Sequence, residues 1–246
     1  MKTITCGVLL GLALGAMMLL AADCFAADND TRPLSPAQIA LFESDHLGSI
    51  RRAERLEYRF AREAAAANAD DAGSYTDRVD IDVRPRADGG KDVWTDFLSA
   101  ERHVPFPPLM DFHGNPVVMF FLERDVGEMH RLTGGAATYF RNRIRQAFVD
   151  QAQVTAIELQ RDGKAVPATE ITLTPFVLDQ HVAVFPGLAE KRYRFVLSES
   201  VPGRIVEIRS EAPSKTGQFS TTETMTFVGE APCTGDIGPC VPVSQQ

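Results

Sequence analysis

The side chains best suited to acid–base or metal chemistry are five histidines, and they are scattered along the chain. The closest pairings with carboxylates are Asp111-x-His113 and Glu128-x-His130, and neither has metal-site spacing. Lys215-Thr216-Gly217 matches one element of the serine β-lactamases, but no Ser-x-x-Lys supplies a nucleophile. His-Glu-x-x-His and Gly-x-Ser-x-Gly are absent as well. The sequence therefore indicates no catalytic residue, no metal site and no cofactor, and an enzyme would need a site assembled from distant residues.

A binding function has better candidates, beginning with the most apolar run after residue 26, Val117–Leu122. In a helix, the stripe facing a core would consist of Val118, Phe121, Leu122, Val126 and Met129. Met119 and Phe120 exceed that stripe, so a helix bearing them must be covered on a second face. We therefore predict Met119, Phe120 and Phe121 as ligand-binding residues beside an apolar cavity. The alternative is simple burial beneath the sheet and a loop, or a buried strand in place of the first helical turn.

A second candidate is a local excess of arginine in an otherwise acidic chain. Four arginines and no acid occur between Arg131 and Val149. Arg141 and Arg145 are four residues apart and share a helical face, whereas Arg143 lies on the other flank. Arg141 and Arg145 are predicted to bind phosphate or carboxylate head groups. Alternatively, their stems cover the apolar face while the guanidinium groups stay in water.

The remaining reactive groups are cysteines. Cys6 and Cys24 lie near the N-terminus, whereas Cys233 and Cys240 are separated by a segment rich in Gly and Pro. In an oxidising compartment this segment would close as a disulfide, and the chain-entropy estimate for so short a loop is about 2.5 kcal/mol. Metal binding is the rival interpretation, but two thiols lack the four-ligand set of a structural zinc site.

The N-terminus predicts export. Lys2 precedes an uncharged apolar run from Ile4 to Leu20 and a small-x-small exit, which is typical of a cleaved signal peptide. We place the cut after Ala26; a retained membrane anchor is the alternative, and Asp23 argues against a lipid-modified Cys24. Removing Lys2 and Asp23 together leaves the net charge at −8. Such an acidic chain should not bind nucleic acid.

The elements that must position these residues follow from periodicity and turn signals. Helices are predicted at Pro36 to about Arg52, Pro116 to about Leu132, and Ala137 to about Gln151. Strand patterns are found at 56–60, 79–83, 93–97, 154–160, 170–176, 193–197, 205–209 and 219–228. The expected organisation is a signal peptide (1–26), a flexible lead-in (27–35), a single domain (36–230) and a disulfide-closed tail (231–246).

This order of elements predicts an α+β fold in which a large curved antiparallel sheet carries an N-terminal helix and an inserted helical pair. It resembles the half-barrel superfamily of lipoprotein carriers of the LolA/LolB type, through the order and number of elements and not through a motif. The Pro-rich crossing and paired helices at 105–150 are heavier than expected for a plain carrier. The resemblance implies non-catalytic binding of an acyl chain or another apolar ligand.

Three functions are therefore carried forward. The leading hypothesis is a periplasmic, non-catalytic protein that binds a lipid or lipoprotein acyl chain and is at most peripheral to the membrane. The second is an envelope interaction or assembly module that docks on a partner protein, for example by strand addition. The third, an uncharacterised hydrolase-type enzyme, has the least support.

Overall fold

The computed structural model describes residues 32–64, 73–185, 187–213, 220–234 and 238–240. The chain divides into two units, Met1–Pro33 and Leu34–Gln246, and the fold described below belongs to the second. The expected signal peptide, its cleavage after Ala26 and the Lys215-Thr216-Gly217 turn all lie outside the described residues.

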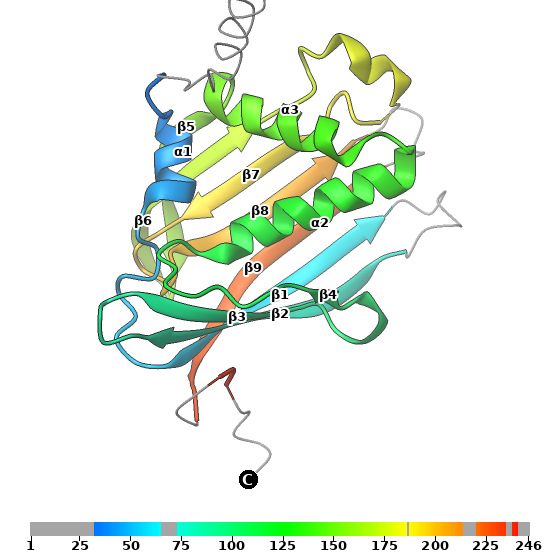
Figure 1. Ribbon diagram of the computed structural model, residues 1–246. Coiled ribbons are helices and arrows are strands. Elements are labelled where there is room, and N and C mark those ends of the chain that lie inside the picture. Colours follow the sequence, from blue (N-terminus) through cyan, green and yellow to red (C-terminus); the bar gives the residue numbers. More distant parts are fainter. Residues whose placement is uncertain (1–31, 65–72, 186, 214–219, 235–237, 241–246) are drawn as a thin grey trace, which may run out of the picture. The chain divides into compact units, whose positions relative to one another are not determined.

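One nine-stranded antiparallel sheet forms the framework, with strand order β4-β3-β2-β1-β9-β8-β7-β6-β5. The strands are β1 (Glu54–Ala64), β2 (Tyr75–Pro85), β3 (Lys91–Phe97), β4 (Val104–Pro105), β5 (Gln153–Arg161), β6 (Lys164–Leu173), β7 (Arg192–Leu197), β8 (Ile205–Ala212) and β9 (Thr221–Pro232). The first and last long strands, β1 and β9, are neighbours, so residues far apart in sequence meet at the centre of the sheet. The sheet curves, and the helices lie on one of its faces (Figure 1). The predicted α+β architecture is confirmed.

The inserted helical pair consists of α2 (Pro116–Thr133) and α3 (Ala137–Asp150). Asn115 caps α2 by accepting a hydrogen bond from the Val117 amide at 3.1 Å, and Gly134 ends the helix with φ of 69°. Both ends agree with the Asn-Pro and Gly-Gly signals in the sequence. Within the described residues, no helix is long and apolar enough to cross a membrane.

The first helix is shorter than predicted. An α-helical segment, α1 (Pro36–Gln38), continues into a π-helical turn, η1 (Ile39–Glu43), and the predicted extension to Arg52 is wrong. Ser44 ends the turn because its amide and its hydroxyl both donate to the Ile39 carbonyl, at 3.0 and 2.9 Å. Leu47 then bonds through its amide to the His113 carbonyl at 3.2 Å, so a long-range contact replaces the helical ladder.

The core lies between the sheet and the helices. Phe121 on α2 packs near Phe60 on β1, with ring centroids 6.3 Å apart, and both are fully buried. Phe120 is also buried, because Phe106 in the Pro-rich crossing stacks on it at 3.8 Å between centroids. The crossing therefore covers part of the second apolar face of α2.

The C-terminal segment is fastened to the outside of β1 and β2. Cys233 and Cys240 are joined as a disulfide, with Cα atoms 4.9 Å apart. Asp82 accepts hydrogen bonds from the Cys240 amide at 2.7 Å and from Arg55 Nε at 2.6 Å. These contacts bury Asp82 and Cys240, and they engage the carboxylate that, among the described residues, lies near both sulfur atoms.

Candidate functional site

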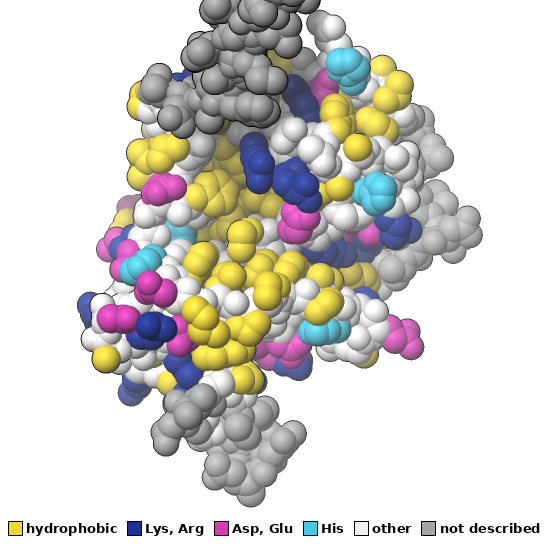
Figure 2. Space-filling model, viewed as in Figure 1, with side chains coloured by type: hydrophobic (Ala, Val, Ile, Leu, Met, Phe, Trp, Pro, Cys, Tyr) yellow, Lys and Arg dark blue, Asp and Glu magenta, His cyan; other side chains and the backbone are white. Residues whose placement is uncertain are grey.

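A groove of about 720 Å³ lies between the first helix, α2 and α3. Its lining residues are Gln38, Phe42, Met119, Leu122, Glu123, Val126, Arg141, Asn142, Ile144, Arg145, Gln146, Phe148 and Val149. Figure 2 shows hydrophobic side chains gathered in this hollow, with basic side chains on its α3 side. The volume falls within the range of about 300–1,000 Å³ that is usual for small-molecule sites.

The floor of the groove is apolar and partly open to solvent. Ile144 and Phe148 on α3 are buried, and Val126 on α2 is buried opposite them. Phe42 contacts Phe148 edge to face, with ring centroids 5.1 Å apart, and closes one end. Phe42 and Met119 nevertheless remain 42% and 43% exposed. Large apolar side chains that stay this exposed around a hollow are typical of a surface that another molecule covers.

The rim of the groove is charged. Arg141 on α3 binds Glu123 on α2 through two parallel contacts, Nε–Oε2 at 3.0 Å and Nη2–Oε1 at 2.5 Å. The hydrogen bond from Arg141, together with the charges of Arg141 and Arg145, lowers the pKa of Glu123, so this carboxyl stays ionised. Arg145, one helical turn after Arg141, is exposed.

The structure brings three of the five predicted ligand-binding residues together. Met119, Arg141 and Arg145 line the groove from two helices. Phe120 and Phe121 do not line it, because Phe120 lies beneath Phe106 and Phe121 faces the sheet core. Met119 therefore lines an apolar groove, whereas Phe120 and Phe121 are buried within the protein.

Sequence reasoning missed two important lining residues. Phe42 falls within the predicted first helix but was not among the predicted ligand-binding residues, and it lines the groove from η1. The role of Glu123 could not be predicted from a local pattern, because its partner Arg141 lies 18 residues away in sequence, on another helix. The remaining arginines of the cluster bind elsewhere: Arg143 pairs with Asp179 at 3.0 Å, and Arg131 with Glu128 at 2.8 Å.

The space beneath the C-terminal half of α2 is filled by buried ion pairs. Lys191 Nζ lies 3.0 Å from Asp125 Oδ1, and Tyr193 donates its hydroxyl to the same carboxylate. Burial, followed by the charge of Asp125, raises the pKa of Tyr193, so it remains a neutral donor. Asp125 is therefore paired with the positive charge of Lys191 and accepts a hydrogen bond from Tyr193, so its buried negative charge is compensated.

A second set of ion pairs lies nearby. Arg62 bridges Glu128 at 3.0 Å and Glu223 at 3.2 Å, and Arg124 reaches Glu223 at 2.5 Å. Burial alone would raise the pKa of Glu128, but hydrogen bonds from Arg131 and Arg62 hold it at about 2. These contacts attach α2 to β1 and β9, and the open hollow lies instead between the helices.

Two histidines, His46 and His130, hold backbone groups in place. His46 is buried, receives a hydrogen bond from the Asn115 amide at Nδ1 (3.2 Å) and contacts the Ala40 carbonyl through Nε2 (2.7 Å). His130 contacts the Gly135 carbonyl at 2.7 Å, beside the end of α2. Glu128, the partner suggested by spacing, directs its carboxylate to arginines instead.

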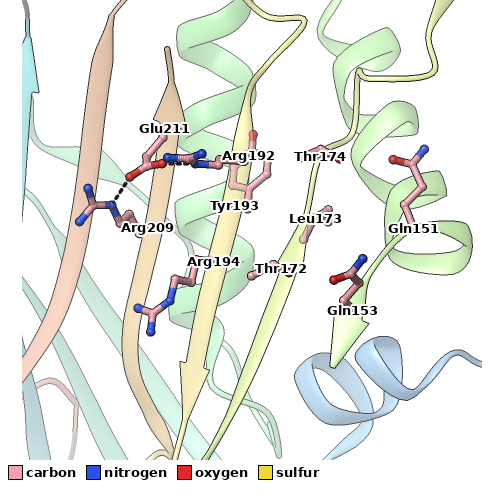
Figure 3. Close-up of a pocket in the computed structure, with 10 residues that line it drawn as sticks. All are labelled: Gln151, Gln153, Thr172, Leu173, Thr174, Arg192, Tyr193, Arg194, Arg209 and Glu211. Atoms are coloured by element: carbon pink, nitrogen blue, oxygen red, sulfur yellow. Dashed lines mark hydrogen bonds and ion pairs between the residues drawn. The ribbon is translucent and has the colours of Figure 1, made fainter. Parts of the chain in front are cut away.

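A second, polar cleft of about 530 Å³ lies on the sheet near β6, β7 and β8. Figure 3 shows Gln151 and Gln153 on one side of it and three arginines on the other. Those arginines are paired: Arg192 and Arg209 both bind Glu211, and Arg194 bridges Glu170 and Glu207. The charges balance, and the cleft lacks the apolar floor of the helical groove.

Comparisons with known proteins find distant structural matches alone. No protein-family model matches the chain, and no curated protein matches it. The lipoprotein LppX of Mycobacterium tuberculosis is 12% identical, with 78% of this chain and 93% of LppX covered at a TM-score of 0.33. MucB is 14% identical, with 81% of this chain but only 59% of MucB covered at 0.33. A LolA superfamily protein of Nitrosomonas europaea is 10% identical, with 84% and 96% covered at 0.23.

A LolA superfamily protein, the type of carrier that the order of elements resembles, is thus among the structural matches. A shared fold does not fix a shared ligand, so the function has to come from the groove itself.

Proposed function

We propose that the chain is an exported, non-catalytic protein of the bacterial envelope, and that the groove between its three helices holds the apolar part of an amphipathic molecule such as a lipid or an acyl chain. One observation carries this proposal: Phe42 and Met119 stay more than 40% exposed while lining a concave apolar surface. Because each side chain is already more than half buried, covering its exposed remainder with a ligand is worth about 1 kcal/mol.

Four further features support the proposal. The N-terminal segment has the pattern of a signal peptide, and the Cys233–Cys240 disulfide suits an oxidising compartment. Met119 provides an adaptable thioether, which fits ligands of variable shape. The arginines at the rim place positive charge where the polar end of an amphiphile would emerge.

The test is binding of a fluorescent fatty acid to the purified protein, together with native mass spectrometry for lipids that co-purify. Met119→Glu should weaken binding about tenfold or more, because a charge replaces apolar contact area. The matched control is Met110→Glu, since Met110 is 53% exposed but lies outside the groove. If wild-type protein binds no amphiphile, or if both variants bind like wild type, the groove is not a lipid site.

A second function, docking of a partner protein by strand addition, is favoured by the edge strand β5. This strand has nine residues, pairs only with β6 among the described strands, and contains neither Pro nor Lys. Natural edge strands usually carry such protective residues. A photo-crosslinking residue at Thr155 on β5, compared with one at Met119, separates the two functions in cells. A protein adduct at Thr155 supports docking, and a lipid adduct at Met119 supports the groove.

A further inference from the structure

The groove has few charged residues, and they differ in whether they already form an ion pair. Of the residues that line it, only Arg141, Arg145 and Glu123 carry a charge, so the site has one net positive charge. We infer that the groove accepts a single-chain amphiphile with one negative charge, that Arg145 binds its head group, and that Glu123 excludes head groups carrying a second negative charge. This inference rests on the proposed function and adds the chemical class of the ligand.

Arg141 is already engaged in the structure. Its guanidinium faces Glu123 with Nε and Nη2, which is the fork-to-fork geometry that makes arginine–carboxylate pairs directional. The pair also joins α3 to α2 across the groove, so it fixes the separation of the two rims. A ligand anion that recruited Arg141 would have to displace Glu123 and leave that carboxylate unpaired beside it.

Arg145 has no comparable engagement. In the portion of the chain described by the structure, Arg145 takes part in no ion pair and no hydrogen bond. Its charge contributes to lowering the pKa of Glu123. Ile144 and Phe148, the apolar floor of the groove, are its neighbours on α3. An acyl chain lying over Ile144 and Phe148 would therefore bring its terminal carboxylate within reach of Arg145, which can bind it with two parallel donors.

Glu123 then sets the charge limit. Its lowered pKa keeps it negative, and it is 48% exposed at the rim opposite Arg145. A carboxylate head group would be neutralised by Arg145. A phosphate monoester carries close to two negative charges at neutral pH, so its second charge would meet Glu123 without a free cation.

The experiment compares three probes on the full chain by calorimetry or fluorophore displacement: palmitate, its uncharged glycerol ester, and hexadecyl phosphate. Wild-type protein should prefer palmitate over the ester by about tenfold, the value of one charge-assisted hydrogen bond at a partly exposed site. Arg145→Gln should abolish that preference, and Arg145→Lys should retain most of it. Glu123→Gln frees Arg141 and should raise the affinity for hexadecyl phosphate about tenfold.

Arg59→Gln on β1 is the matched control, because Arg59 is exposed and lies outside the groove. Equal melting temperatures of wild type and variants show that the fold is intact, and if Arg145→Gln is destabilised, Arg145→Ala, which also lacks the charge, is used in its place. If all three probes bind wild type equally, or if Arg145→Gln keeps the preference for palmitate, the inference is wrong while the groove remains a lipid site. If none of the probes binds, the proposed function itself fails.

Discussion

At the scale of single residues, burial keeps the side chain of His46 uncharged. His46 is 1% exposed, and burial, partly offset by the Ala40 hydrogen bond, lowers its pKa below the usual 6.5. The Nδ1 atom accepts from the Asn115 amide, which requires the neutral ring with its proton on Nε2. The local structure around the start of α2 therefore depends on an uncharged histidine.

The pH dependence of stability follows from this residue. Because the folded pKa is lower than the unfolded one, the unfolded chain binds the proton more readily, and stability falls as pH drops below about 6.5. We expect the melting temperature to decrease between about pH 7 and pH 5.5, a window above the titration of the lowered carboxyls such as Glu128.

His46→Gln should flatten that pH dependence, whereas His181→Gln, which alters a side chain 83% exposed, should leave it unchanged. Thermal denaturation at a series of pH values measures the effect. An unaltered slope in His46→Gln would show that another group is responsible.

At the scale of elements, Asn115 joins three parts of the fold. Its side chain caps α2 and donates to the Tyr58 hydroxyl and to the Gly203 carbonyl, both at 2.9 Å. Gly203 has φ of 74°, and a Cβ there would lie 2.8 Å from Asn115 Nδ2, so the turn before β8 is built against this cap.

Asn115→Ala should therefore lower the free energy of unfolding by about 2–3 kcal/mol, from the lost cap and the buried partners left without a hydrogen bond. Asn115→Ser keeps a capping oxygen and should recover about 1 kcal/mol of that loss. Urea denaturation measures both variants. Equal stability of the alanine and serine variants would mean that the cap contributes nothing.

The ion pair between Asp125 on α2 and Lys191, the residue before β7, provides a second test at this scale. Lys191→Met leaves Asp125 charged and buried, which should cost about 3–5 kcal/mol. The double variant Lys191→Met/Asp125→Asn removes the charge while keeping a partner for Tyr193, so it should be more stable than the single variant. A double variant as unstable as Lys191→Met would show that charge burial is not the cause.

Local signals predicted the elements well, and long-range contacts account for the differences. Asn115-Pro116 and Gly134-Gly135 placed both ends of α2 because capping depends on neighbouring residues. The first helix instead ends at Ser44, and the chain after it is held by the bond between Leu47 and His113, which no local pattern reveals. The burial of Phe120 by Phe106, and the pairing of Arg141 with Glu123, likewise arise only when the chain folds.

At the scale of the whole molecule, the disulfide joins the residue after β9 to Cys240, which Asp82 on β2 and Arg55 on β1 bind. Replacing Cys233 and Cys240 by Ser should lower stability by about 2.5 kcal/mol, from the greater entropy of the unfolded chain. A reductant should destabilise wild type to a similar extent and leave the double variant unaffected. Chemical denaturation with and without reductant measures this, and a response of the double variant would contradict it.

The two borders of the sheet are built differently. Within the described residues, the two residues of β4 and a single bridge from Leu109 lie beside β3, and Pro105, Pro107 and Pro108 in this segment offer no amide hydrogen. The border at β5 is nine residues long, contains no proline and carries the charged residues Glu158 and Arg161. In the described part of the chain, an added strand could therefore form a longer ladder beside β5 than beside β3.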